Sequence, residues 1–321
     1  MHKTSRNILL DILKVISALF VICTHCGFLF EYSEVAFQTI TNGIFRIAVP
    51  FFFCVNGFFL YNVFKNNRMR IWLKRVGILY LIWMLFYTYF WVFLNDFNLL
   101  KIITTFLFGF NHLWYLAALL LGGLVLYILR NVSNTILIVS TLILFLIGIT
   151  IQYLGQLHIF SQQTTLDKLI NYPPLHRNFL LFALPLLSIG YVLRRTNYHT
   201  KLSKKFVINA VIISLMLLVA ENLITYYYIT GNLILNTYLS YIFLAPALLI
   251  AAFTFKITSN LNSKVISLYS IALYLIHPLI IFLILHFFKL ESTPLTFVTI
   301  LLSGILSYLL IALNKKLKYI L

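Results

Sequence analysis

Ten long apolar runs divide this chain of 321 residues, and they constrain its fold more than any other feature. About 20 apolar residues in a helix cross the hydrocarbon core of a bilayer. On that basis we predict spans at residues 8–30, 40–63, 74–95, 112–130, 134–154, 178–194, 206–229, 236–255, 266–288 and 294–314. Hydrophobic residues make up 62% of the chain and charged residues only 10%, too few charges for a soluble protein of this length. The sequence therefore predicts an all-α, polytopic transmembrane helical bundle.

The charged residues predict how this bundle is oriented. If the N-terminus is cytoplasmic, most of the 24 Lys and Arg residues fall in cytoplasmic loops, with runs at 65–75, 194–205 and 315–318. Most of the seven acidic residues then fall outside. This bias follows the positive-inside rule, so we predict that both termini are cytoplasmic. The net charge of +17 then faces anionic lipid headgroups or an anionic cytosolic ligand, and no nucleic acid is expected as a partner.

We interpret residues 1–321 as a single integral-membrane domain. The first span has polar residues in its core and no small-residue cleavage site, so it should be retained rather than removed as a signal peptide. Segment 100–110 is too short to span and should lie at the interface or re-enter, and the connector 155–176 should pack on the outer face. Cys23-Thr24-His25-Cys26 lacks the second pair of ligands that zinc needs, so we expect no metal site.

Ionisable residues inside the first span indicate a polar interior. Asp11, Lys14 and His25 fall on one stripe of this helix, because each residue turns it by about 100°. Such groups are costly in lipid, so the stripe should face protein or a water-filled cavity. Arg46 in the second span is predicted at nearly the depth of His25. A polar interior site and snorkelling of Arg46 toward the headgroups both fit that depth.

Further polar residues extend this predicted site. Tyr115, Arg177 and Glu221 should lie in the outer half near His25, whereas His277 should lie deeper, beside a proline that leaves one backbone carbonyl free. Internal packing is the alternative interpretation of His277. At the inner face, the Arg75 guanidinium can form bidentate pairs with a phosphate or carboxylate. The sequence thus predicts a polar site that opens outward, with basic groups leading to it from the cytoplasm.

The order of several fragments resembles the acyltransferase 3 family of integral membrane acyltransferases over nearly the whole chain. The fragments are RNILLDILKVISALFVICTHCGF, RIAVPFFFCVNGFFL, the basic run that ends at Lys74 and Arg75, HLWYLAALLLGGLVLYIL, FALPLLSIGYVLR and SLYSIALYLIHPLI. The fragment RNFLLFALPLLSIGY is also similar to the membrane domain of vancomycin-resistance-type serine racemases. We find no counterpart of the racemase domain itself.

The resemblance implies transfer of an acyl group, acetyl first and succinyl second, from cytosolic acyl-CoA to a hydroxyl of an extracytoplasmic or lipid-linked polysaccharide or cell-wall glycan. It implies that His25 acts as the base or carries the acyl group, that Arg46 stabilises the oxyanion or orients the donor, and that Glu221 orients His25 or a basic partner. Arg75 would hold CoA. The remaining substrate-binding candidates are Asp11, Lys14, Tyr115, Arg177 and His277.

The resemblance also implies a donor, partners and a cellular location, and two other classes of function remain open. The donor would be acyl-CoA without a metal, the partners would be membrane lipids, a glycan acceptor and a polysaccharide synthesis complex, and the location would be a bacterial plasma membrane. A secondary transporter or flippase, amino-acid uptake included, fits the same apolar spans and sparse charges. A structural subunit of a synthesis complex is a third class. The choice between acetyl and succinyl depends on cavity size and a counter-charge.

Overall fold

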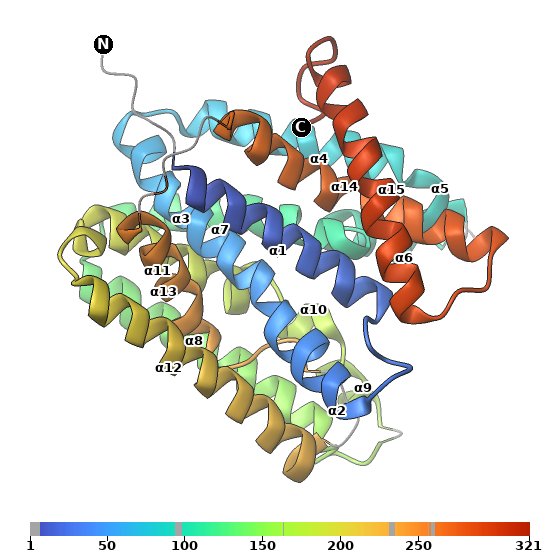
Figure 1. Ribbon diagram of the computed structural model, residues 1–321. Coiled ribbons are helices and arrows are strands. Elements are labelled where there is room, and N and C mark those ends of the chain that lie inside the picture. Colours follow the sequence, from blue (N-terminus) through green and yellow to red (C-terminus); the bar gives the residue numbers. More distant parts are fainter. Residues whose placement is uncertain (1–6, 94–97, 163, 231–234, 256, 258–260) are drawn as a thin grey trace.

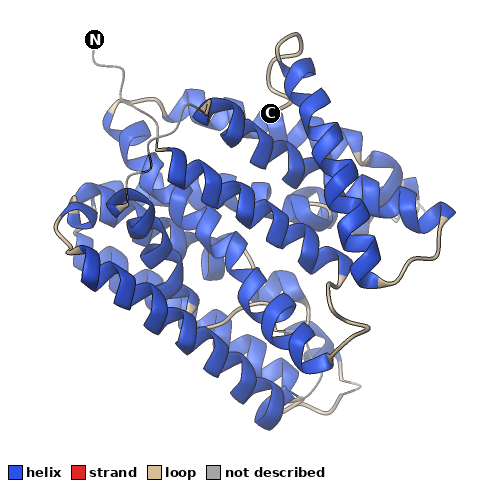
Figure 2. Cartoon of the chain, in the orientation of Figure 1, coloured by secondary structure: helices blue, strands red, loops and turns tan. Residues whose placement is uncertain are grey.

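The computed structural model describes residues 7–93, 98–162, 164–230, 235–255, 257 and 261–321. Every regular element in these ranges is a helix (Figure 2). The prediction of an all-α bundle is therefore confirmed. Arg6, which opens the first family-like fragment, and residues 94–95 of a predicted span lie outside the described residues.

The longer helices form the frame of the bundle. In chain order they are α1 (Ile8–Cys26), α3 (Ala48–Lys65), α4 (Met69–Phe86), α6 (Leu99–Phe108), α7 (Trp114–Ile128), α8 (Asn134–Gln156), α11 (Leu184–Arg195), α12 (Lys204–Thr225), α13 (Tyr241–Thr254), α14 (Ser263–Phe287) and α15 (Ser292–Asn314). The shorter elements are α2 (Glu34–Ala36), η1 (Phe37–Ile44), η2 (Phe45–Ile47), α5 (Thr88–Trp91), η4 (Asn111–Leu113), η5 (Leu129–Asn131), α9 (Thr165–Ile170), α10 (Pro173–His176), η6 (Phe179–Ala183), η7 (Tyr198–Thr200) and η8 (Tyr226–Thr230).

Seven helical segments among the described residues are long and apolar enough to cross a membrane. They are Ile8–Cys26, Glu34–Lys65, Asn111–Asn131, Asn134–Gln156, Lys204–Ile229, Ser263–Phe287 and Ser292–Asn314. The other three predicted spans, 74–95, 178–194 and 236–255, also contain helices, but these are shorter or carry several basic residues. α13, for example, has 14 residues, and α4 has Arg70, Lys74 and Arg75 within its first two turns. Seven candidate spans are therefore shown, and ten remains a prediction.

Helix α1 lies at the centre of the bundle (Figure 1). It packs most extensively on α14, and it also contacts α3, α13 and α15. Asn7 begins the helix, since its side chain accepts a hydrogen bond from the backbone N–H of Leu10 at 3.0 Å. Gly27 ends it in the left-handed conformation, with φ of 75°. Residues of α1 can therefore face cavities that several other helices line.

Helices α3 and α11 meet backbone to backbone. A Cβ atom placed on Gly57 would lie 2.0 Å from the carbonyl oxygen of Leu187, and one placed on Gly190 would lie 1.9 Å from that of Cys54. Both contacts are far shorter than any ordinary Cβ contact. Each helix thus contributes one glycine at the crossing, and no other residue type permits this approach.

The segments predicted to lie outside the spans fold as short helices. Segment 100–110 falls mostly in α6, an apolar helix of 10 residues. The connector 155–176 contains α9 and α10, which contact α8. It is fastened by a hydrogen bond of 3.0 Å between His158 Nδ1 and Asp167 Oδ2. The short helices in both segments agree with the prediction that neither segment spans a membrane. The positions of the segments relative to a membrane remain predictions.

Candidate functional site

His25 lies in the last turn of α1 and opens onto two cavities. The larger cavity, about 460 Å³, is also lined by residues of α5 and α14, among them Phe90 and Phe282. The smaller, about 70 Å³, is lined by residues of η2, α3 and α7. The His25 side chain is exposed although it lies among packed helices, because these cavities reach it. A substrate in either cavity could therefore contact the imidazole.

His277 lies next to His25, with the two ring centroids 5.1 Å apart. Pro278 has no N–H, so the carbonyl of Tyr274 four residues earlier lacks its helical donor. His277 Nδ1 lies 2.8 Å from that carbonyl oxygen, and because a carbonyl can only accept, Nδ1 carries the hydrogen. In the neutral ring Nε2 is then an acceptor, and it has no partner among the described residues.

A third imidazole, His112 in η4, continues this row into the bundle. Its ring centroid lies 5.4 Å from that of His277. Both of its ring nitrogens are buried without a partner in the described part of the chain, and its carbonyl accepts a hydrogen bond from the Tyr274 hydroxyl. Sequence reasoning missed His112. The available signal was a histidine at the start of a predicted span, and its neighbours Trp114 and Tyr115 drew attention instead as interface anchors.

Arg46 and Arg177 meet beside His25, although they are far apart in sequence. Arg46 lies in η2 and Arg177 lies directly after α10. Their Nη1 atoms donate to the same oxygen, Asn236 Oδ1, at 3.4 Å and 3.0 Å. Arg46, Arg177 and His25 all line the cavity of about 70 Å³. The Arg177 guanidinium also stacks on Trp114, 4.5 Å from its ring centroid.

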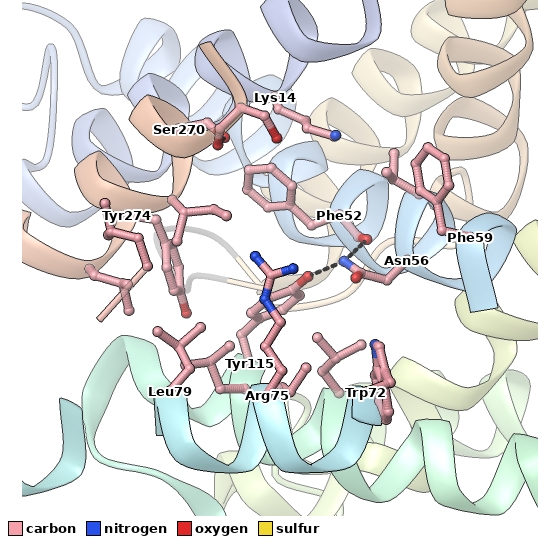
Figure 3. Close-up of a pocket in the computed structure, with 18 residues that line it drawn as sticks. Lys14, Phe52, Asn56, Phe59, Trp72, Arg75, Leu79, Tyr115, Ser270 and Tyr274 are labelled. Atoms are coloured by element: carbon pink, nitrogen blue, oxygen red, sulfur yellow. Dashed lines mark hydrogen bonds between the residues drawn. The ribbon is translucent and has the colours of Figure 1, made fainter. Parts of the chain in front are cut away.

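A separate cavity of about 270 Å³ opens near the N-terminal end of α1, the end that we predict to face the cytoplasm. Figure 3 shows Lys14 and Arg75 reaching it from opposite walls, with aromatic and aliphatic side chains between them. Lys14 is held by an ion pair of 2.8 Å to Asp11. The buried Asp11 also accepts a hydrogen bond from the Ser263 hydroxyl. We call this space the inner cavity.

Two tyrosines close the inner cavity on the side of the imidazole row. Tyr115 and Tyr274 both line it, with ring centroids 5.6 Å apart. Asn56 donates to the Tyr115 hydroxyl at 2.7 Å (Figure 3). Tyr274 also contacts His112, with ring centroids 5.3 Å apart. The side chain of Tyr274 therefore lies between the inner cavity and His112, the nearest member of the row of imidazoles.

Glu221 does not make the contacts that we predicted for it. Its two carboxylate oxygens accept hydrogen bonds from the backbone N–H groups of Leu239 at 2.6 Å and Ser240 at 2.8 Å. These groups lie directly before α13, which begins at Tyr241. The carboxylate thus stabilises the start of α13, and its hydrogen bonds go there rather than to His25 or a basic side chain.

The other predicted residues separate into two groups. The outer group, around His25, contains Arg46, Arg177 and His277. The inner group consists of Lys14, Arg75 and Tyr115, which line the inner cavity, together with Asp11, which holds Lys14. Besides His112, sequence reasoning missed Asn56 and Asn236. Neutral amides in apolar surroundings gave no signal of their own, because their partners lie far away in the sequence.

Comparison with known proteins supports an acyltransferase. A family model described as an acyltransferase domain matches residues 7–313. An amino-acid racemase of Enterococcus faecalis is 26% identical over 348 residues, which cover 96% of this chain and 46% of the relative. A second amino-acid racemase of the same organism is 30% identical over 149 residues, which cover 44% of this chain and 21% of the relative.

The chain thus spans less than half the length of these curated relatives. No solved structure matches it. The family match covers all the longer helices of the bundle and both groups of site residues. This chain belongs to the acyltransferase 3 family, and it is a membrane protein of the acyltransferase type.

Proposed function

We propose that this protein transfers an acyl group, acetyl in the first instance, from cytosolic acyl-CoA to a hydroxyl of an extracytoplasmic or lipid-linked glycan. The observation that carries the proposal is the position of His25, whose ring opens onto outer cavities while a tyrosine wall separates the neighbouring imidazoles from a cavity rimmed by cations. We propose a bacterial plasma membrane as the location. Membrane lipids and a polysaccharide synthesis complex are the proposed partners.

The inner cavity fits the donor. Its walls are largely apolar, and its charged side chains, Lys14 and Arg75, are both cationic. Arginine pairs with phosphate through two parallel hydrogen bonds, so Arg75 suits the phosphates of CoA. The volume of about 270 Å³ lies near the lower limit for pockets that hold small molecules. It therefore suits the acyl group and the pantetheine arm, with the nucleotide outside among the basic residues of the inner face.

The larger outer cavity suits the acceptor. Phe90, Phe110 and Phe282 line it together with the polar side chains of Asn111 and His286. Aromatic rings present flat apolar faces on which the C–H faces of a sugar can lie, and the polar groups can fix the sugar's orientation. Because His25 lines the same cavity, the imidazole would contact a hydroxyl of the bound acceptor.

His25 would act as the general base in this reaction. Its imidazole takes the proton of the acceptor hydroxyl while the hydroxyl oxygen attacks the thioester carbonyl carbon, which reaches His25 from the inner cavity when the Tyr274 side chain moves aside. The positive charge of Arg46, which lines a cavity with His25, stabilises the oxyanion that forms. The C–S bond then breaks, the thiolate of CoA receives the proton from the imidazolium, and the products are an ester and free CoA. His277 would serve as a positioning residue for the His25 ring.

Transport is the second candidate function. Two observations favour it: cavities lie on both sides of one aromatic wall, and α13 and α14 each carry a proline inside the helix, as discontinuous helices of secondary transporters do. The relatives named amino-acid racemase make an amino acid the first substrate to test. A transporter would exchange labelled amino acid across sealed vesicles without consuming acyl-CoA.

Inverted membrane vesicles test the proposed function, because they expose the predicted cytoplasmic face to acyl-CoA, which does not cross membranes. We would supply acetyl-CoA or succinyl-CoA labelled in the acyl group, with native cell-wall extract in the lumen. We expect release of CoA and appearance of label in luminal glycan. His25→Ala should abolish both, whereas His158→Gln, a histidine on the connector after α8, should abolish neither.

Two results would contradict the proposal. Equal transfer by wild type and His25→Ala would remove His25 from the reaction. No transfer from either donor, combined with exchange of labelled amino acid by the same vesicles, would favour the transporter.

A further inference from the structure

Two guanidinium groups share one neutral partner beside His25. Arg46 and Arg177 both donate to Asn236 Oδ1, and Arg46 also donates to Asn42 Oδ1 through Nε and Nη2 at 3.4 Å. All of these acceptors are uncharged amides. In the described ranges the acidic side chains close to a basic one are Asp11, beside Lys14, and Asp167, beside His158, so neither Arg46 nor Arg177 is paired with an acidic side chain there.

This arrangement is costly without an anion. Placing two like charges close together inside a protein is unfavourable, and each loses hydration that a neutral amide oxygen replaces only in part. Both side chains are half-buried, so water compensates their charges only in part, and cations in such surroundings are normally paired with an acidic group. The chain places both guanidinium groups at a cavity of about 70 Å³ and supplies no carboxylate from the described residues. A ligand would supply the negative charge that this cavity lacks.

The acceptor that the two arginines share is rigidly held. The Asn236 backbone N–H donates to Gln152 Oε1 at 2.9 Å, and Gln152 Nε2 donates to the carbonyl of Thr237 at 2.9 Å. Gln152 is buried on α8, so the segment that carries Asn236 is fixed to that helix. The pair of guanidinium groups is thus preorganised, with Arg177 further held by stacking on Trp114.

We propose that Arg46 and Arg177 bind a carboxylate of the substrate next to His25. This inference rests on the proposed function and refines it, because it names an anionic substrate class. The oxyanion of acyl transfer accounts for only one negative charge and exists only in the transition state. The second guanidinium group is positively charged at every stage of the reaction, so it matches a ligand group with a permanent negative charge. A carboxylate also fits the small cavity, whereas a whole sugar or nucleotide does not.

Such a carboxylate can have two sources. It can be the free end of a dicarboxylic acyl group such as succinyl, or it can belong to an acceptor such as a uronic acid or an amino-acid substituent. The chemistry at the two arginines is the same in both cases. The choice between donor and acceptor is therefore left to the experiment.

The first arm of the experiment measures binding and needs no acyl transfer. The purified protein in detergent is melted with sodium succinate, with sodium acetate, and with succinamide as the uncharged control at matched ionic strength. We expect both carboxylates to raise the melting temperature of wild type and of Lys168→Gln, which removes an exposed positive charge on α9. Succinamide should have no effect. Arg177→Gln should weaken carboxylate binding about tenfold or more, the value of one charge-assisted hydrogen bond.

The outcomes of this arm decide the proposal. Equal carboxylate shifts in wild type and Arg177→Gln, or no shift in wild type, would overturn it. If Arg177→Gln is not monodisperse, Arg46→Gln reports on the same site with the same expectation. Because acyl-CoA is absent, a failure of the proposed function leaves these results interpretable.

The second arm identifies the source of the carboxylate. Transfer by wild type and Arg177→Gln is compared with acetyl-CoA and with succinyl-CoA. A loss of about tenfold confined to succinyl-CoA would assign the carboxylate to the acyl group. A similar loss with both donors would assign the carboxylate to the acceptor. Equal transfer by wild type and variant with both donors would overturn the proposal that Arg177 binds a substrate carboxylate during acyl transfer.

Discussion

Replacing Gly57 by alanine should push α3 away from α11 and destabilise the bundle. The new Cβ would lie 2.0 Å from the Leu187 carbonyl oxygen, whereas ordinary contacts begin at 3.4 Å. The obstacle is backbone in a helix, so it cannot rotate aside as a side chain would. Overpacking an interior costs about 1–3 kcal/mol, and a rigid obstacle places this substitution at about 3 kcal/mol. At about 2–4 °C for each kcal/mol, the melting temperature should fall by about 6–12 °C.

Gly77→Ala is the matched control. It makes the same chemical change in α4, where nothing lies within 4 Å of the new Cβ. Alanine favours a helix over glycine by up to about 1 kcal/mol, so this variant should be as stable as wild type or slightly more stable. Both variants would be purified in detergent and melted side by side. Gly190→Ala, which meets the Cys54 carbonyl from the other helix, should behave like Gly57→Ala.

Equal melting temperatures for Gly57→Ala and Gly77→Ala would refute the reasoning, because they would show that α3 and α11 do not depend on this approach. The substitution also reports on the site. Asn56, next to Gly57, holds the Tyr115 hydroxyl at 2.7 Å in the wall of the inner cavity. A shift of α3 should therefore also impair acyl transfer in the protein that remains folded.

Three further substitutions test individual residues. Arg75→Gln should raise the KM for acyl-CoA about tenfold and leave kcat nearly unchanged, whereas Lys168→Gln, which removes an exposed cation on α9, should alter neither. Glu221→Gln should cost about 1–2 kcal/mol of stability through weaker bonds to the start of α13; a large loss of kcat at equal amounts of folded protein would contradict this capping role. Burial, and then the charge of Arg177, lower the pKa of His176 from 6.5 to about 4, so the unfolded chain binds more protons between these pH values. Stability should be complete above about pH 6.5 and fall by at most about 1.4 kcal/mol per pH unit on acidification; His176→Gln should lose less stability between pH 7 and 5, and equal losses would exclude His176 as the cause.

The sequence predicted the helices of this bundle well where length and hydropathy act together. Seven of the ten predicted spans contain a helical segment of 19 or more residues, as α8 and α15 do. Predicted span 236–255 folded into only the 14 residues of α13, because its first residues form an irregular segment that carries Asn236. Hydropathy predicts that such a segment is apolar. It does not predict that side chains from other helices hold its backbone in a non-helical conformation.

Parts of the site could be predicted from depth along each helix. The structure brings Arg46 and Arg177 to the cavity that His25 lines, although the roles of all three remain proposals. Depth alone did not predict the partners of Glu221, because a position along a helix axis does not say which way a side chain points around it. The Glu221 carboxylate points toward the backbone before α13. Asn236 could not be predicted at all, since its function as a shared acceptor exists only in the folded chain.

Prolines and changes of helix type accompany the charged residues of this site. Pro50 follows η2, the irregular turn that holds Arg46. Pro185 follows η6, which begins two residues after Arg177. Pro278 frees the carbonyl that fixes the hydrogen of His277. Irregular backbone at membrane depth is tolerated only where protein or a cavity satisfies its polar groups. Two changes of helix type and one carbonyl without its helical donor around this cavity system therefore give the same indication as the arginines without an acidic partner: the bundle is least regular around the site that we propose for a polar substrate.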